Sequence, residues 1–139
     1  MMKIASLRAA GLGVGLCMAL IAGASASAAE ALSLGDRVGL QAALQQHIDR
    51  QSVDGAYLHL RADSGEVGTL YPATTHPVIM RMGENFVLCY DFRDASGASV
   101  DVDFYFARKD ASFVVFHTAV AEHALLKRLI SEGKASRAD

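Results

Sequence analysis

The sequence predicts an α+β fold in which an N-terminal helix, a six-stranded antiparallel meander sheet and a C-terminal helix follow one another. Three observations predict it. Apolar residues recur every four positions between residues 40 and 48, and then alternate with polar residues through most of residues 56 to 118. A second helical pattern covers residues 119 to 132. Short turn sequences separate the alternating stretches, which is typical of consecutive hairpins.

The first helix is predicted from its cap and its apolar spacing. Ser33 is a typical N-cap residue, and an acidic residue follows it three positions later. Leu40, Leu44 and Ile48 recur at intervals of four, which places them on one side of a helix that ends near Gln51.

Six strands are predicted after this helix, at residues 56–62, 67–71, 76–82, 85–93, 99–108 and 113–118. In the first strand, Leu58 and Leu60 lie on the apolar side, and Tyr57 and His59 lie on the polar side. Pro72 is expected to end the second strand because proline lacks the N–H group that a sheet requires.

The last helix is predicted over residues 119–132. Val120, Leu125, Leu129 and Ile130 give it an apolar side, and Gly133 is a natural C-terminal stop. The whole order of elements resembles the cystatin-like and nuclear-transport-factor-2-like cone folds. This resemblance rests on element order and on no motif, so it implies a curved sheet with a pocket beside the helix and implies no site residue.

The first 29 residues are interpreted as a signal peptide. Lys3 and Arg8 precede an apolar run over residues 9–23, and two small-residue sequences within residues 24–28 fit a signal-peptidase site. The mature chain would begin at residue 29 or 30 and be periplasmic or secreted. An uncleaved N-terminal anchor is the alternative. The apolar run is shorter than the roughly 20 residues that a spanning helix needs, so no membrane span is expected after cleavage.

Residues 30–139 form a single predicted α+β domain. Without Lys3 and Arg8, the number of basic residues falls from 13 to 11 against 15 acidic ones, so the net charge changes from −2 to −4. This acidic balance argues against nucleic acid as a partner. Cys89 is the one cysteine left in the domain, so no internal disulfide is expected. No cofactor is predicted, and a homodimer through the sheet is an open alternative.

The register of one hairpin can be predicted from its loop. A three-residue loop with left-handed Gly97 pairs Asp94 with Ala98. Four apolar cross-strand pairs then fall on one face: Phe92–Val100, Tyr90–Val102, Leu88–Phe104 and Phe86–Phe106. This agreement favours the register because a slip of one residue would move every side chain to the other face.

The other face of this hairpin is polar and is predicted to place Asp91 opposite Asp101 and Cys89 opposite Asp103. A solvated outer face is the favoured interpretation. The alternative is the polar floor of a ligand pocket. The ligand-binding candidates are Asp91, Asp101, Asp103, Tyr105 and His117.

His117 has two possible positions. An even-numbered turn after Arg108 would pair Arg108 with Phe113 and place His117 in the core opposite Phe104, which is the favoured prediction. A bulge would instead place His117 beside Asp103 and Tyr105, where an acid–base dyad could form.

The stretch "HPVIMRMGENFVLCYDF" (residues 76–92) contains soft metal ligands. With a two-residue turn at Gly83, the side chains of His76, Met80, Met82 and Cys89 would share a face and could suit Cu(I). With a three-residue loop, the methionines would fill the aromatic core. Both loops are possible, and packing in a hairpin is the favoured interpretation over a metal site.

The predicted function is therefore an exported domain of binding or accessory type, with an unknown small molecule or protein as its ligand. The absence of a nucleophile motif, a phosphate loop and a zinc motif favours binding over catalysis. An isomerase or dehydratase with an Asp/Tyr/His pocket is the first alternative, and a copper-binding accessory protein is the second.

Overall fold

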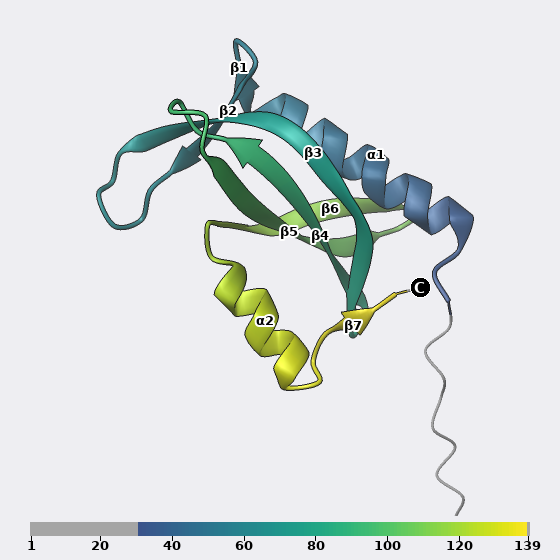
Figure 1. The fold of residues 1–139 in the computed structure, drawn as a ribbon. Coiled ribbons are helices and arrows are strands. Elements are labelled where there is room, and N and C mark those ends of the chain that lie inside the picture. The colour runs from purple at the N-terminus through teal and green to yellow at the C-terminus, as the bar shows by residue number, and fades with distance from the viewer. Residues whose placement is uncertain (1–30, 139) are drawn as a thin grey trace, which may run out of the picture.

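A computed structural model gives the structure of the protein and describes residues 31–138 (Figure 1). The predicted signal peptide lies outside the described residues. The elements are α1 (Leu34–Gln51), β1 (Ser52–Val53), β2 (Ala56–Leu60), β3 (Val67–Met82), β4 (Asn85–Arg93), β5 (Ser99–Lys109), β6 (Ser112–Val120), α2 (His123–Ser131) and β7 (Ser136–Arg137). They confirm the α+β fold with a helix before and a helix after an antiparallel meander.

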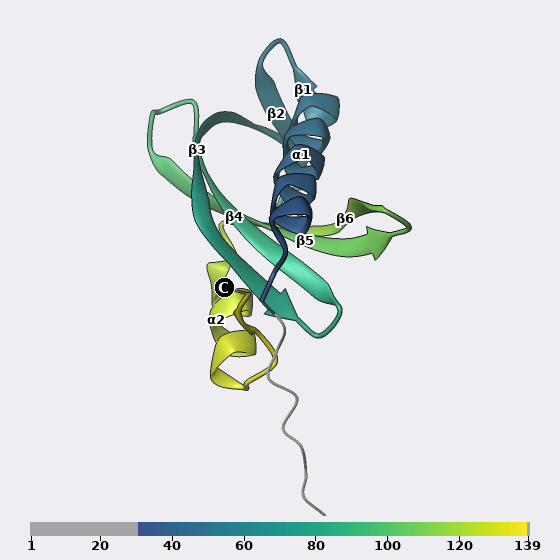
Figure 2. The ribbon, with the colours of Figure 1, turned by 90° about the vertical axis from the view of Figure 1, so that its right-hand side faces the viewer.

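The seven strands form one antiparallel sheet in the order β1-β2-β3-β4-β5-β6, and β7 pairs with β3. The sheet curves strongly and is not a closed barrel, with α1 against one face and α2 against the other (Figures 1 and 2). Among the described residues, neither helix is both long and apolar enough to cross a membrane.

The first helix forms as predicted. The Ser33 hydroxyl oxygen accepts a hydrogen bond from the Asp36 backbone N–H at 3.0 Å, which satisfies one of the free N–H groups of the first turn. Leu40, Leu44 and Ile48 are the buried residues of α1.

The long strand β3 corrects the prediction of two separate strands over residues 67–71 and 76–82. It continues through Pro72 and Pro77, with register shifts against β4 on both sides of Thr74 and Thr75. The prolines are tolerated because β2 pairs only with residues 67–70 and β7 only with Met80 and Arg81. Between these two partners, one edge of β3 is open and needs no proline N–H.

The β4–β5 register is confirmed. Asp91 pairs with Asp101, Cys89 with Asp103, and all four predicted apolar pairs form. The β3–β4 connection is the two-residue turn, since Met82 pairs with Asn85 and Met80 pairs with Val87.

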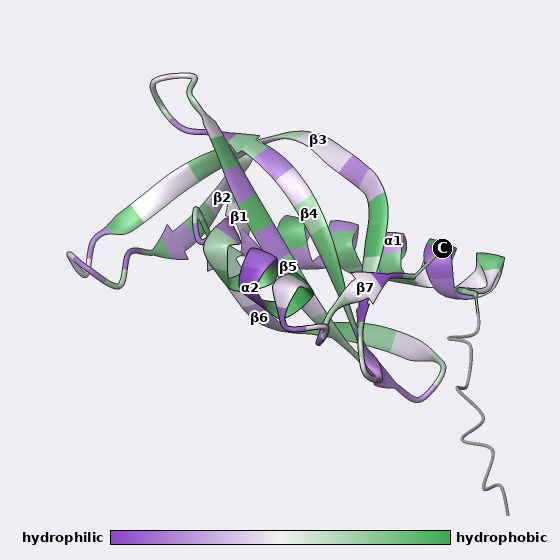
Figure 3. Cartoon of the chain, turned by 60° about the horizontal axis from the view of Figure 1, so that its bottom comes forward, coloured by the Kyte–Doolittle hydropathy of each residue, from purple (hydrophilic) through white to green (hydrophobic). Residues whose placement is uncertain are grey.

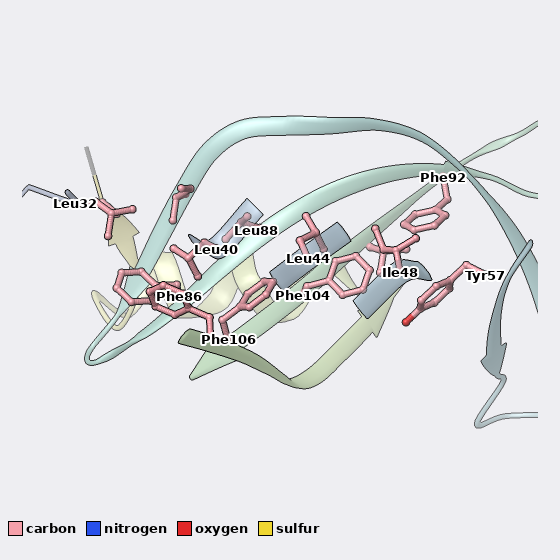
Figure 4. Close-up of a cluster of buried hydrophobic side chains, with 14 of the residues drawn as sticks. Leu32, Leu40, Leu44, Ile48, Tyr57, Phe86, Leu88, Phe92, Phe104 and Phe106 are labelled. Carbon is pink, nitrogen blue, oxygen red and sulfur yellow. The ribbon is translucent and has the colours of Figure 1, made fainter. Parts of the chain in front are cut away.

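The larger hydrophobic core lies between α1 and the sheet, and we call it the α1-side core (Figure 4). Phe104 is fully buried in it, and its ring meets that of Tyr57 edge-on, with the ring centroids 6.0 Å apart. Tyr57 is 1% exposed, whereas Leu60 is 70% exposed. The predicted polar and apolar sides of the first strand were therefore wrong, because α1 covers the side with the tyrosine.

The second cluster lies under α2, and we call it the α2-side cluster. Its buried members are Met80, Val87, Tyr105, Ala119, Leu126 and Ala135. The helix begins at His123 rather than at residue 119, because residues 119 and 120 still pair with β5 as the end of β6. Gly133 adopts a positive φ of 68° after the helix, which confirms the predicted stop.

Candidate functional site

The predicted polar face is where α2 lies, and α2 divides it into a buried and an exposed part. Polar and apolar residues alternate along the central strands (Figure 3). Asp103 is 1% exposed and Tyr105 is 2% exposed. Asp101 is exposed. Asp91 is half-buried, and its carboxylate oxygen lies 2.8 Å from the His76 Nε2. The favoured interpretation of a solvated face is thus wrong for Asp103 and Tyr105, because the helix covers them.

Asp103 and His123 form an ion-pair contact at the centre of this face. The His123 Nδ1 lies 2.9 Å from one carboxylate oxygen of Asp103 and 3.2 Å from the other. The aspartate comes from β5, and the histidine is the first residue of α2, with a side chain that is 35% exposed. A buried carboxylate needs such a partner, since an unpaired one would be very costly to bury.

Cys89 lies opposite Asp103 on β4 and belongs to the same group. Burial, a hydrogen bond with the Asp103 carboxylate, and the charges of Asp103, Asp101 and Asp91 raise the pKa of the Cys89 thiol well above its usual range. The thiol is therefore protonated at neutral pH and is a poor nucleophile.

Tyr105 completes the group on β5. Burial, followed by the charges of Asp103 and Cys89, raises the pKa of Tyr105 to about 12. Its hydroxyl is buried and has no hydrogen-bond partner among the described residues. Buried polar groups of this kind are uncommon and call for an explanation.

His117 is not in the core as favoured. A register shift between Tyr105 and Phe106 places His117 directly opposite Tyr105, with the two ring centroids 5.3 Å apart. The bulge predicted as the alternative register therefore occurs. His117 itself is exposed, and the histidine bonded to Asp103 is His123.

Three of the four predicted soft ligands lie in the α2-side cluster, and His76 lies outside it. Met80 is buried in the α2-side cluster, with Met82 and Cys89 packed against it. His76 is exposed and contacts Asp91. In the part of the chain that the structure describes, the group able to hold a metal ion is instead Cys89, Asp103 and His123.

A groove lies at one end of the sheet, on the side that faces α1. Its volume is about 540 Å³, which lies within the usual range for small-molecule sites. Its apolar lining includes Leu70, Val100 and Val120. Its polar and charged lining includes His59, Arg61 and Asp94. A neighbouring hollow of about 520 Å³ shares His59, Arg61, Val120 and Ala121 with the groove, and His117 lines it.

His59 occupies its place in the groove because Gly68 lies opposite it. A Cβ atom on Gly68 would come within 2.4 Å of the His59 Nε2. Burial and then the charge of Arg61 lower the pKa of His59. A neutral imidazole with a nitrogen lone pair can accept or donate a hydrogen bond at this position.

The backbone beside the groove is strained at Ala121, which has a φ of 56°. Its N–H donates to the Asp101 carbonyl at 2.9 Å, where the chain leaves β6 and turns towards α2. A left-handed residue other than glycine costs energy and persists where the surrounding structure requires it.

Sequence reasoning missed His123 and His59 as site residues. The predicted helix began at residue 119, which belongs to the end of β6, so no local pattern in the sequence placed His123 over Asp103. His59 was placed on a polar strand side, and its pairing with Gly68 depends on a hairpin register that was not worked out. Both positions come from tertiary packing.

Comparison of the chain with models of protein families, with curated proteins and with solved structures finds no match.

Proposed function

We propose that this protein is an exported binding domain that takes a small amphipathic molecule in the groove at the end of the sheet. The observation that carries the proposal is the groove of about 540 Å³, whose lining combines apolar side chains with His59 and Arg61. An apolar cleft with a few convergent polar groups is the usual form of a small-molecule site.

The lining holds a cation at Arg61 and a carboxylate at Asp94. One Asp94 oxygen already accepts hydrogen bonds from Ser96 and Ala98. The lining therefore favours a ligand with an apolar body and an anionic or hydrogen-bonding end at Arg61 and His59. The apolar body would lie on Leu70, Val100 and Val120. Arg61 already has a counter-charge, because its guanidinium contacts the Glu66 carboxylate. Both side chains are exposed, so this pair is weak and can exchange for a ligand contact.

Export is part of the proposal and is supported by the sequence of residues 1–29. We expect the protein in the periplasmic or secreted fraction, with an N-terminus at Ala29 or Glu30 by mass spectrometry. An intact N-terminus in the membrane fraction would favour the uncleaved anchor instead.

The groove can be tested with one tryptophan substitution and a matched control. Ser96 lies in an exposed hairpin loop that lines the groove, and its hydroxyl donates to Asp94. Ser64 lies in another exposed hairpin loop, and its hydroxyl lies 3.5 Å from Glu66. Ser96→Trp would fill part of the groove, whereas Ser64→Trp changes a loop outside its lining.

The probe is 1-anilinonaphthalene-8-sulfonate, an amphipathic anion whose fluorescence rises in apolar sites. We expect Ser96→Trp to weaken its binding at least tenfold and Ser64→Trp to leave binding within a factor of two. Equal affinity in all three proteins, or a larger loss in Ser64→Trp than in Ser96→Trp, would contradict the proposed site. Native mass spectrometry of the purified protein would then identify any bound organic molecule.

The isomerase or dehydratase alternative receives less support. It depends on Asp103 and His117 acting together in one cavity, and Asp103 is instead buried against His123.

A further inference from the structure

The α2-side cluster contains three metal-ligating side chains from three different elements. The Cys89 sulfur on β4, a carboxylate oxygen of Asp103 on β5 and a ring nitrogen of His123 on α2 all lie within 4.8 Å of one another. We propose that Cys89, Asp103 and His123 form a binding site for a borderline divalent cation, with Zn²⁺ as the best fit.

The donor set favours zinc by its chemistry. Zinc in proteins is bound by thiolate, imidazole and carboxylate groups, usually in a tetrahedral arrangement. Hard cations such as Mg²⁺ and Ca²⁺ prefer oxygen donors and would gain little from Cys89 and His123. Three protein ligands leave one position for water, as in zinc sites that are open to solvent or substrate.

The distances between His123 and Asp103 need only a small adjustment. Zinc–ligand bonds of about 2.0–2.3 Å set the ligand atoms about 3.3–3.8 Å apart in a tetrahedron. The His123 Nδ1 now lies 2.9 Å and 3.2 Å from the two oxygens of Asp103. The histidine is partly exposed and begins a helix, so it can move outward by the fraction of an ångström that the ion requires.

The charges also match a divalent cation. A Cys89 thiolate and an Asp103 carboxylate carry two negative charges, and neutral His123 adds none. One divalent ion would make the group neutral, which matters because Asp103 is 1% exposed and a buried net charge is costly.

A second observation points to a ligand here. The Tyr105 hydroxyl is buried, has no hydrogen-bond partner among the described residues, and lies on the same face of β5 as Asp103. Leaving such a group unpaired costs about as much as a lost hydrogen bond. A water molecule that accompanies the ion and reaches this hydroxyl would give it a partner.

The test is a cobalt titration, because Co²⁺ replaces Zn²⁺ and absorbs light where Zn²⁺ does not. The titration uses the full chain with the substitution Cys17→Ser, so that Cys89 is the remaining thiol. We expect one Co²⁺ per chain, with visible bands of tetrahedral cobalt and a thiolate charge-transfer band. Added Zn²⁺ should remove these bands.

The variants separate this site from the other histidines. Cys89→Ser and His123→Gln should each weaken Co²⁺ binding at least tenfold and remove, respectively, the charge-transfer band and the tetrahedral spectrum. His76→Gln is the matched control, because His76 contacts an aspartate on the same sheet at 2.8 Å but lies outside the group. Binding that survives in Cys89→Ser, or that is lost in His76→Gln, would overturn the proposal.

A measurement on the unsubstituted site protects the test against variants that fail to fold. Urea unfolding of the unsubstituted protein is followed with and without Zn²⁺, and chelator is added at the end as a reversal. We expect Zn²⁺ to raise the unfolding midpoint, because a ligand that binds the folded state stabilises it, and chelator to restore the original midpoint. An unchanged midpoint, together with the absence of a cobalt spectrum, would show that Asp103 and His123 form an anchoring pair only.

Discussion

The sheet is attached to its two helices in different ways. On the α1 side, Leu40, Leu44 and Ile48 pack onto an aromatic floor, and the charged contact lies at the rim. There, the Arg108 guanidinium donates a hydrogen bond to the Asp36 carboxylate of α1, with 2.8 Å between nitrogen and oxygen. Charge takes no part in the centre of this interface.

On the α2 side, the charged contact lies in the centre. The helix buries one residue, Leu126, and its first residue meets the buried carboxylate of Asp103. An apolar interface of many residues gains its stability from buried apolar area and does not depend on any one polar or charged group. A small interface built around a buried carboxylate depends on the group that pairs with that carboxylate. The α1 side therefore provides the scaffold, and the α2 side holds the buried charged groups.

The largest expected effect would come from the α1-side core. Phe104→Ala should lower the free energy of unfolding by about 3–5 kcal/mol, because the ring is fully buried and leaves a cavity. Leu126→Ala should cost about 2 kcal/mol, at the low end for a buried leucine, because the short helix α2 can move inward. Urea unfolding followed by circular dichroism measures both.

Matched controls exist for both substitutions. Phe116 is 53% exposed on β6, and Ile130 is 44% exposed on α2. Replacing either with alanine should change the free energy of unfolding by less than about 1 kcal/mol. If Leu126→Ala destabilised the protein more than Phe104→Ala, the assignment of the scaffold to the α1 side would be wrong.

A smaller effect is expected from the buried ion-pair contact. His123→Ala, measured with chelator present, should lower the free energy of unfolding by about 1.5–3 kcal/mol, because it removes a hydrogen bond to a buried carboxylate. His76→Ala breaks an exposed contact of the same type with Asp91 and should cost at most about 1 kcal/mol. Equal losses would mean that Asp103 gains other partners when His123 is removed.

Local patterns were enough to predict much of the fold. The cap at Ser33, the core positions of α1 and the β4–β5 register follow from spacing and turn chemistry, because each involves residues close in sequence. The register of β4 against β5 also placed Cys89 beside Asp103 correctly. Two of the three members of the proposed metal site were thus predicted as neighbours.

The remainder depends on contacts between distant segments. The continuity of β3 through its prolines depends on where its partners β2 and β7 end. No glycine marks the bulge in β6, so the sequence favoured a regular register that placed His117 in the core. The position of His123 over Asp103 depends on that bulge and on the fold-back of the chain after β6, which no periodicity in α2 encodes.

The smallest expected effect concerns pH and the α1 side. His47 lies half-buried on α1, with its Nε2 3.3 Å from the Tyr57 hydroxyl, and burial followed by the charge of Arg50 lowers its pKa. Because the folded protein disfavours the protonated ring, the unfolded chain binds more protons as the pH falls below the ordinary histidine pKa of about 6.5. Stability should therefore decrease from pH 7.5 to pH 5.

His47→Gln removes this titration and keeps a polar group beside Tyr57. We expect urea unfolding of the variant to depend less on pH between 7.5 and 5 than that of the parent, while His76→Gln, at an exposed histidine, should follow the parent more closely. If the variant keeps the full pH dependence, the groups that make the protein acid-sensitive lie outside α1. His59, whose pKa is also lowered by burial, would then be the next histidine to replace.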